Sequence, residues 1–178
     1  TPVIAGFQAA YATKPGVNSA AQSATASSVD AAGQIVDYSL TYANGPVKAV
    51  VSHFKKDNSL KQTQFAVNYI LGAATLIAGT HTEKSDGSAT AADFSGSNVG
   101  LKYAVAPKVT LLAQYAKLND KLTANKDKKI TGLGAQYAFS TRTNAYVRYV
   151  SEKFDNNSTA ATDKAKVNTT IFGLAHAF

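Results

Sequence analysis

Apolar and polar residues alternate along this chain in about ten short segments. Alternation with a period of two is typical of a β-strand whose two faces meet different surroundings, and no stretch carries a helical apolar stripe of useful length. Each segment is close to the ~9–11 residues that a tilted membrane-crossing strand needs. The predicted strands are Val3–Thr13, Gln34–Ala43, Val47–Lys56, Gln62–Leu71, Thr75–Lys84, Asn98–Val105, Lys108–Leu118, Ile130–Phe139, Thr143–Glu152 and Val167–Phe178. The pattern predicts an all-β chain, folded as one antiparallel up-and-down domain over residues 1–178.

The connections between these segments alternate between two kinds. Short turns are expected at Asn44–Pro46, Leu71–Ala73, Ala106–Pro107 and Ser140–Thr141, and long polar stretches at Lys14–Gly33, Asp57–Lys61, Ser85–Ser97, Asn119–Lys129 and Lys153–Lys166. A soluble sandwich has no reason to sort its loops by length to opposite ends. Outer-membrane barrels do, because their periplasmic turns are short and their extracellular loops are longer. The layout therefore predicts a transmembrane β-barrel wall with periplasmic short turns and extracellular long loops.

The tyrosines distinguish a membrane wall from a half-buried soluble sheet, which alternation alone fits equally well. All nine tyrosines fall in predicted strands, and eight lie on the more apolar parity, with Tyr146 the exception. Rows of amphipathic rings that bound an apolar band are typical of the two bilayer interfaces. The predicted aromatic girdle comprises Tyr42, Tyr69, Tyr103 and Tyr137 near the short turns, and Tyr11, Tyr115 and Tyr149 toward the far strand ends.

The opposite parity is predicted to face water, because it carries small and polar residues where a narrow barrel would need bulky side chains to fill its interior. The chain has 18 Lys and Arg against 11 Asp and Glu. A charged ring in a pore enriches counter-ions and repels ions of its own sign. We therefore expect a weak preference for anions. The candidate pore-lining residues are Lys48, Lys102 and Arg148, opposed chiefly by Asp37, together with Gln114 and Gln136.

Missing residue types and motifs exclude several functional classes. The chain has no Cys, so a disulfide framework, a thiolate zinc site and a cysteine nucleophile are excluded. No apolar run approaches the ~20 residues of a membrane helix, and no secretory signal follows Thr1. A glycine-rich phosphate loop and a metal-ligand cluster are both absent from the sequence, so no cofactor is expected. Nor do the charges gather on one face with aromatics between them, so no nucleic-acid partner is expected.

Two pairs of a histidine and a carboxylate represent the enzyme alternative. His81 and Glu83 share a strand face, and His53 lies near Asp57 at the loop-side rim. No motif of fixed spacing supplies a nucleophile, a base and an orienting group together. We expect no enzymatic activity.

The last predicted strand carries a more specific signal. Its alternate residues Phe172, Leu174, His176 and Phe178 form an amphipathic pattern that ends on an aromatic side chain. A terminal Phe in a soluble protein would usually fray. In outer-membrane proteins, a C-terminal aromatic residue on an amphipathic strand is the feature that the barrel-assembly machinery reads.

Four stretches of the sequence resemble the general porins of Gram-negative bacteria, and within them most closely the anion-preferring porins of beta-proteobacteria. They are Tyr42–Val47, Gln136–Tyr146, Phe172–Phe178, and the opening Thr1-Pro2 with Gly6–Ala9. The resemblance runs the length of the chain and covers roughly the last ten of about sixteen strands. It implies a channel for passive diffusion of small hydrophilic solutes and ions, located in the outer membrane.

The resemblance also implies partners: outer-membrane lipid and lipopolysaccharide, the remaining N-terminal barrel strands, a homotrimer and the barrel-assembly machinery. The first six strands of such a porin, with the inward-folded loop that narrows the pore, have no counterpart in this chain. Two alternatives follow from that departure. One is a self-closed ten-stranded barrel that acts as a protease or lipase, and the other is a translocator or anchor, for which a pore-threading helix before Val3 would be expected.

Overall fold

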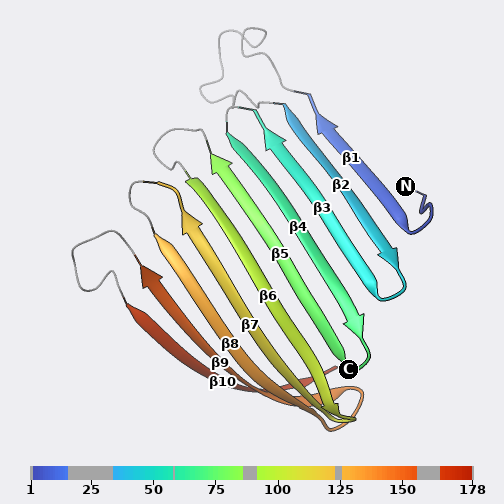
Figure 1. The fold of residues 1–178 in the computed structure, drawn as a ribbon, viewed down its shortest axis with the longest axis vertical. Coiled ribbons are helices and arrows are strands. Elements are labelled where there is room, and N and C mark those ends of the chain that lie inside the picture. The colour runs from blue at the N-terminus through green and yellow to red at the C-terminus, as the bar shows by residue number, and fades with distance from the viewer. Residues whose placement is uncertain are drawn as a thin grey trace, which may run out of the picture.

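The computed structural model describes residues 2–15, 34–57, 59–85, 92–122, 126–155 and 165–177, which form one sheet of ten strands (Figure 1). The strands are β1 (Phe7–Lys14), β2 (Ile35–Asn44), β3 (Val47–Lys56), β4 (Leu60–Leu71), β5 (Ala74–Ser85), β6 (Ala92–Ala106), β7 (Val109–Asp120), β8 (Asp127–Ala138), β9 (Thr143–Asp155) and β10 (Lys166–His176). Their spatial order is their chain order, and every neighbouring pair is antiparallel. The predicted all-β meander is confirmed. No helix in the described ranges is long and apolar enough to cross a membrane.

Two strand boundaries differ clearly from the prediction. Strand β6 begins at Ala92 rather than Asn98, because the stretch before Asn98 pairs with β5 from Ala92 and with β7 from Phe94, although it carries few apolar residues. Strand β1 begins at Phe7 rather than Val3. Ile4 and Phe7 exchange backbone hydrogen bonds of 2.9 Å across a tight turn.

Gly6 is the residue that this tight turn requires. Its φ is +84°, and an added Cβ would lie 2.6 Å from the carbonyl oxygen of Ala43. The Gly6 carbonyl accepts a 2.8 Å hydrogen bond from the Ala43 N–H. A side chain at this position would therefore separate the start of β1 from the end of β2.

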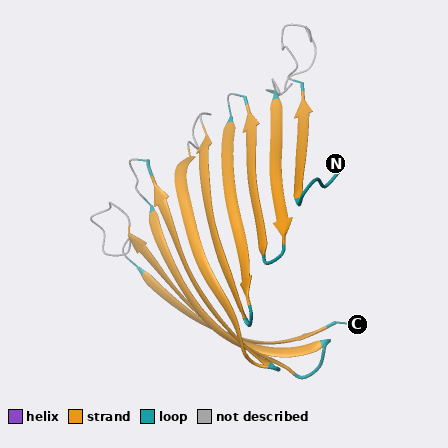
Figure 2. Ribbon diagram, turned by 45° about the vertical axis from the view of Figure 1, so that its right-hand side comes forward, coloured by secondary structure: helices purple, strands orange, loops and turns teal. Residues whose placement is uncertain are grey.

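The sheet bends along its width into a section of a curved wall (Figure 2). Four short turns between strands gather at one end, where the marked chain ends also lie (Figure 1). The expected long connection at Asp57–Lys61 is wrong, because only three residues separate β3 from β4 at the other end. Among the described strands, β1 pairs only with β2 and β10 pairs only with β9, so the two edges do not close on each other.

No apolar side chain is buried in the described part of the chain. Large apolar side chains instead stand open on the sheet, with Val99 at 56%, Leu133 at 55% and Leu174 at 71% exposure. Soluble monomers rarely leave a contiguous apolar surface of this extent uncovered. One face of the sheet therefore needs a partner other than water.

Candidate functional site

The strand register assigns each side chain to one of two faces, because residues directly opposite on neighbouring strands point the same way. One continuous row of pairs runs from Tyr69 through Leu76, Leu101, Ala113 and Leu133 to Tyr149. We call this side the tyrosine face. The other side, the mixed face, carries small, polar and charged residues and also some apolar ones, such as Ile77 and Leu112.

Eight of the nine tyrosines lie on the tyrosine face, and four of them follow a regular step. Tyr42, Tyr69, Tyr103 and Tyr137 lie on alternate strands, and each stands one row, or two residues, further along than the one before. A shift of one residue per strand, set against a rise of ~3.3 Å and a strand spacing of ~4.8 Å, corresponds to a tilt of roughly 35°. Membrane barrels have tilts in this range.

His176 takes the next position in this series. It lies on the tyrosine face of β10, one row beyond the row of Tyr137, and its Nδ1 is 2.8 Å from the Thr143 hydroxyl oxygen. Phe172 and Leu174 lie on the same face with exposures of 79% and 71%. Phe178 lies outside the described residues.

At the other end of the strands, Tyr11 and Tyr38 pair on β1 and β2, while Tyr115 and Tyr149 lie on β7 and β9. Rows of rings therefore occur toward both ends of the tyrosine face, with an apolar band between them. Val67, Ala78 and Val99 lie within that band in one row.

The register places all six candidate pore-lining residues on the mixed face. Lys102 lies in one row with Leu112, Gly134 and Arg148. The others are Lys48, which shares a row with Gln114, Gln136, which pairs with Tyr146, and Asp37, which pairs with Phe54.

Arg148 is held flat against the wall. One Nη donates hydrogen bonds to the carbonyls of Ala135 at 3.0 Å and Val147 at 3.1 Å, and the Tyr146 ring centroid is 4.9 Å from the guanidinium carbon. The Arg148 side chain crosses Gly134, where an added Cβ would lie 2.6 Å from its Cδ. These contacts fix a permanent charge at a defined place on the mixed face.

Sequence reasoning missed the contacts that hold the Arg148 side chain. In the sequence, Tyr146 is distinguished only as the one tyrosine outside the apolar parity. Its ring lies over Gly173, where the side chain of any larger residue would clash with the ring. Gly134 and Gly173 are thus the two gaps that receive neighbouring long side chains. The signal available in the sequence was the spacing of Tyr146 and Arg148 on one strand face, but their glycine partners depend on the register.

Lys102 and Arg148 line one hollow of about 380 Å³ together with Asn98 and Gln114. The lining comes mainly from mixed-face residues of β5 to β10, which can converge only on the concave side of the curved sheet. Three strand spacings separate the backbones of Lys102 and Arg148, about 14 Å. Neither Lys48 nor Asp37 lines this hollow.

The predicted polar parity is wrong in one respect, because apolar side chains also line this hollow. They are Ile77, Leu112, Val150 and Ile171. A wall of this kind polarises less than water, so the field of nearby charges falls off less steeply. Apolar neighbours therefore strengthen the electrostatic effect of Lys102 and Arg148.

The two histidine and carboxylate pairs fare differently. His81 Nε2 lies 3.6 Å from Glu83 Oε2, which also accepts a 2.7 Å hydrogen bond from Gln62. His53 and Asp57 do not form a pair: His53 contacts the Thr63 hydroxyl at 2.8 Å, and Asp57 binds Lys55 at 2.7 Å. The described residues contain no group of three or more His, Asp and Glu that could hold a metal ion.

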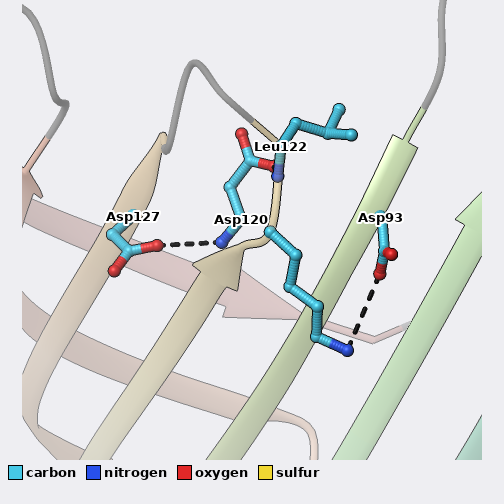
Figure 3. A network of polar contacts seen from close by, with 5 residues as sticks. Asp93, Asp120, Leu122 and Asp127 are labelled. Atoms are coloured by element: carbon cyan, nitrogen blue, oxygen red, sulfur yellow. Dashed lines mark hydrogen bonds and ion pairs between the residues drawn. The ribbon is translucent and has the colours of Figure 1, made fainter.

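Polar contacts order the loop-side end of β7, well beyond Tyr115 and outside the apolar band (Figure 3). The Asp120 carboxylate accepts 3.0 Å hydrogen bonds from the backbone N–H groups of Leu122 and Lys126, and these bonds hold the pKa of Asp120 below its usual value. Asp127 accepts a 2.8 Å hydrogen bond from the Asp120 N–H, and Lys121 reaches Asp93 of β6 at 3.6 Å.

Comparison with known proteins accounts for a sheet with these two faces. The sequence matches the sequence model of a Gram-negative porin family over residues 1–157. The chain belongs to the Gram-negative porin family. Its strands are therefore part of a multi-pass β-barrel in the outer membrane, and the enzyme alternative is set aside. No protein of curated function matches the sequence.

Solved structures share the porin fold at low sequence identity. A loop-deletion mutant of OmpT, an outer membrane protein of Vibrio cholerae, is 16% identical over 81% of this chain and 54% of that chain, with a TM-score of 0.63. OccAB4 of Acinetobacter baumannii is 17% identical over 86% of this chain and 46% of that one, with a TM-score of 0.65. A refined porin structure is 15% identical over 96% and 59%, with a TM-score of 0.60. The chain spans about half the length of these structures.

Proposed function

We propose that this porin chain forms part of the wall of a water-filled channel, through which small hydrophilic solutes and ions diffuse passively. The observation that carries the proposal is the hollow on the mixed face, where Lys102 and Arg148 lie with Asn98 and Gln114. The opposite, tyrosine face supplies an apolar band for lipid. The short turns then lie on the periplasmic side and the long loops outside the cell.

The channel is proposed to prefer anions, because the two signs of charge are unevenly distributed over the mixed face. Among the described strands, its basic residues are Lys14, Lys48, Lys56, Lys102, Lys128 and Arg148, and its acidic residues are Asp37, Glu83, Asp120 and Glu152. Three acids lie near the loop-side ends, where Glu152 pairs with Lys128 at 2.8 Å. The hollow further down the wall has two basic residues and no acidic one.

Reversal potentials in planar bilayers across a KCl gradient test this function. The Lys102→Gln/Arg148→Gln variant should move the reversal potential toward the cation side while the channel stays open. Lys129→Gln/Lys153→Gln is the matched control, because it removes two charges from the tyrosine face and should leave selectivity unchanged. Cation selectivity of the unmodified channel would refute the anion preference, and absence of any conductance would refute the channel.

Closure of the barrel is proposed to need further strands, about sixteen in all. In the described strands the two edges remain apart, and the chain covers 54% of the OmpT variant and 59% of the refined porin. The chain has no Cys, so a Gln8→Cys/Ala175→Cys variant can test the alternative. A disulfide formed within a single chain would indicate a self-closed ten-stranded barrel.

The remaining partners are proposed from the family resemblance and from the last strand. They are a homotrimeric assembly of complete barrels, and the barrel-assembly machinery, which would read the exposed Phe172 and Leu174 with His176 on β10. Crosslinking in intact cells tests both. Replacing Phe172 and Leu174 with Ser should reduce the amount of assembled barrel, with Thr169→Ser on the mixed face of the same strand as control.

A further inference from the structure

Four lysines stand side by side on the tyrosine face at the loop-side end of the sheet. Lys117 of β7 pairs with Lys129 of β8, Lys129 pairs with Lys153 of β9, and Lys153 pairs with Lys166 of β10. We call these four residues the outer lysine row. They point away from the hollow that the proposed channel uses.

Direct opposition of like charges destabilises a sheet, because paired side chains have their Cβ atoms only ~4.5–5.5 Å apart. The described residues supply no compensating ion pair: the ion pairs found there involve Lys55, Lys121, Lys128 and His81. Asp127 and Asp155 lie on the same face one row further out, paired with each other, and Asp127 accepts the Asp120 N–H. The outer lysine row thus keeps a net positive charge that an external anion would relieve.

The position of the outer lysine row along the strands, relative to the tyrosines, indicates which anion would bind it. Lys117 stands two residues beyond Tyr115, and Lys153 four residues beyond Tyr149, on the side away from the apolar band. Lys129, Lys153 and Lys166 are exposed. A long side chain that leaves the apolar band at this height places its ammonium group among lipid headgroups.

Lysines are also paired across neighbouring strands elsewhere at this end of the sheet. Lys55 of β3, Lys61 of β4 and Lys84 of β5 form a second row of directly paired lysines on the tyrosine face at the same end. This second group is compensated by acidic neighbours, because Lys55 binds Asp57 at 2.7 Å and Lys84 pairs with Asp93 of β6. The proposal therefore rests on the outer lysine row alone.

We propose that the outer lysine row binds the phosphate groups of anionic lipids in the outer leaflet. Neighbouring ammonium groups share a phosphate between them, and the bound lipid offsets the repulsion along the row. The proposal rests on the orientation given above, with the long-loop end outside the cell. It assigns the tyrosine face a specific headgroup site in addition to its general contact with acyl chains.

The test measures lipid binding to the porin as its cell produces it, purified in zwitterionic detergent and titrated with phosphatidylglycerol or with diphosphorylated lipid A while native mass spectrometry counts bound lipids. Lys129→Gln/Lys153→Gln should weaken lipid binding about 30-fold, because each lysine near the membrane surface contributes roughly a fivefold gain in affinity. Lys129→Arg/Lys153→Arg should bind like the wild type. Lys48→Gln/Lys56→Gln is the matched control, because it removes the same charge from the mixed face of β3 and should leave lipid binding intact.

Three results would overturn the proposal: wild-type affinity in the Lys129→Gln/Lys153→Gln variant, an equal loss in the mixed-face control, or equal binding of zwitterionic phosphatidylcholine. Loss of trimers rather than of lipid in the tyrosine-face variant would also refute it, because the row would then contact a second subunit. Conductance is recorded on the same preparations. If the Lys129→Gln/Lys153→Gln variant conducts and binds lipid like the wild type, only the lipid site is refuted. If the wild-type preparation does not conduct, the proposed channel is refuted.

Discussion

Lys102 and Arg148 lie in one hydrogen-bonded row of the mixed face, with Leu112 and Gly134 between them. The two cations are held differently. Arg148 donates to two backbone carbonyls and stacks on Tyr146, whereas Lys102 makes no hydrogen bond or ion pair with any described residue. One charge is therefore anchored to the wall, whereas the other is carried on a flexible four-carbon stem.

This difference predicts that exchanging Arg and Lys has unequal effects at the two sites. Lys102→Arg keeps a mobile cation, so the reversal potential should stay within the error of the wild type. Arg148→Lys keeps the charge but loses the fork of donors and the ring stacking, so anion preference should fall partway toward that of Arg148→Gln. Equal shifts for Lys102→Arg and Arg148→Lys in planar bilayers would contradict the fixed position of Arg148.

Gly134 should be intolerant of even one methyl group. A Cβ there meets the Arg148 Cδ at 2.6 Å and would push the guanidinium off the Ala135 carbonyl. We expect Gly134→Ala to lower the free energy of unfolding by about 1 kcal/mol, the net value of one such hydrogen bond. Gly132→Ala is the control, since its Cβ would meet Gln114 at an ordinary 3.8 Å. Urea unfolding in micelles measures the free energy of unfolding of both variants. Equal losses for Gly134→Ala and Gly132→Ala would argue against the contact between Arg148 and Gly134.

A charge should destabilise the protein in the apolar band of the tyrosine face, but not on the mixed face. Leu133 lies in the apolar band with 55% exposure, so Leu133→Lys should cost about 2–4 kcal/mol in lipid bilayers. Gln136→Lys, on the mixed face of the same strand, should cost close to nothing. Folding titrations in liposomes compare the two variants. A Leu133→Lys variant as stable as Gln136→Lys would mean that this face does not contact lipid.

Asp120 predicts a pH dependence confined to the loop-side end of β7. Its folded-state pKa is lowered by two backbone N–H donors, so the stabilisation is present above the unfolded-state pKa and is lost as the pH falls through the folded-state pKa. The protection of the Leu122 and Lys126 amides from hydrogen exchange, taken relative to intrinsic exchange at each pH, should fall over that interval. Asp120→Asn leaves one acceptor oxygen for two donors and should speed exchange at neutral pH. Asp155→Asn serves as control.

The sequence predicts the number and order of the strands well, because a sheet with two unlike faces imposes a period of two on its residues. Strand ends beyond the apolar band escape this signal. The start of β6 at Ala92 follows backbone pairing with Ser85 of β5, and β7 joins the pairing from Phe94 onward. The start of β1 at Phe7 is set by the turn at Gly6. The apolar residues Val3 and Ile4 before this turn continue the alternating pattern, so the sequence predicts a strand there.

The site is less predictable, because its contacts depend on register. Parity assigns Lys102 and Arg148 to one face from the sequence alone, but only the register shows that Gly134 stands between them. The outer lysine row has the same character. Lys129 reads as part of a polar loop in the sequence, and its alignment with Lys117 and Lys153 emerges only when β7, β8 and β9 are paired.

The separate edges of the sheet have a consequence for handling the protein. In the part of the chain that the structure describes, β1 and β10 each pair with a neighbouring strand on one side only, and they border an apolar face. Such an edge is a template for adding another strand. These 178 residues produced without a covering segment should therefore stack edge to edge into fibrillar or insoluble aggregates, and a strand-forming peptide that caps β1 should slow that growth.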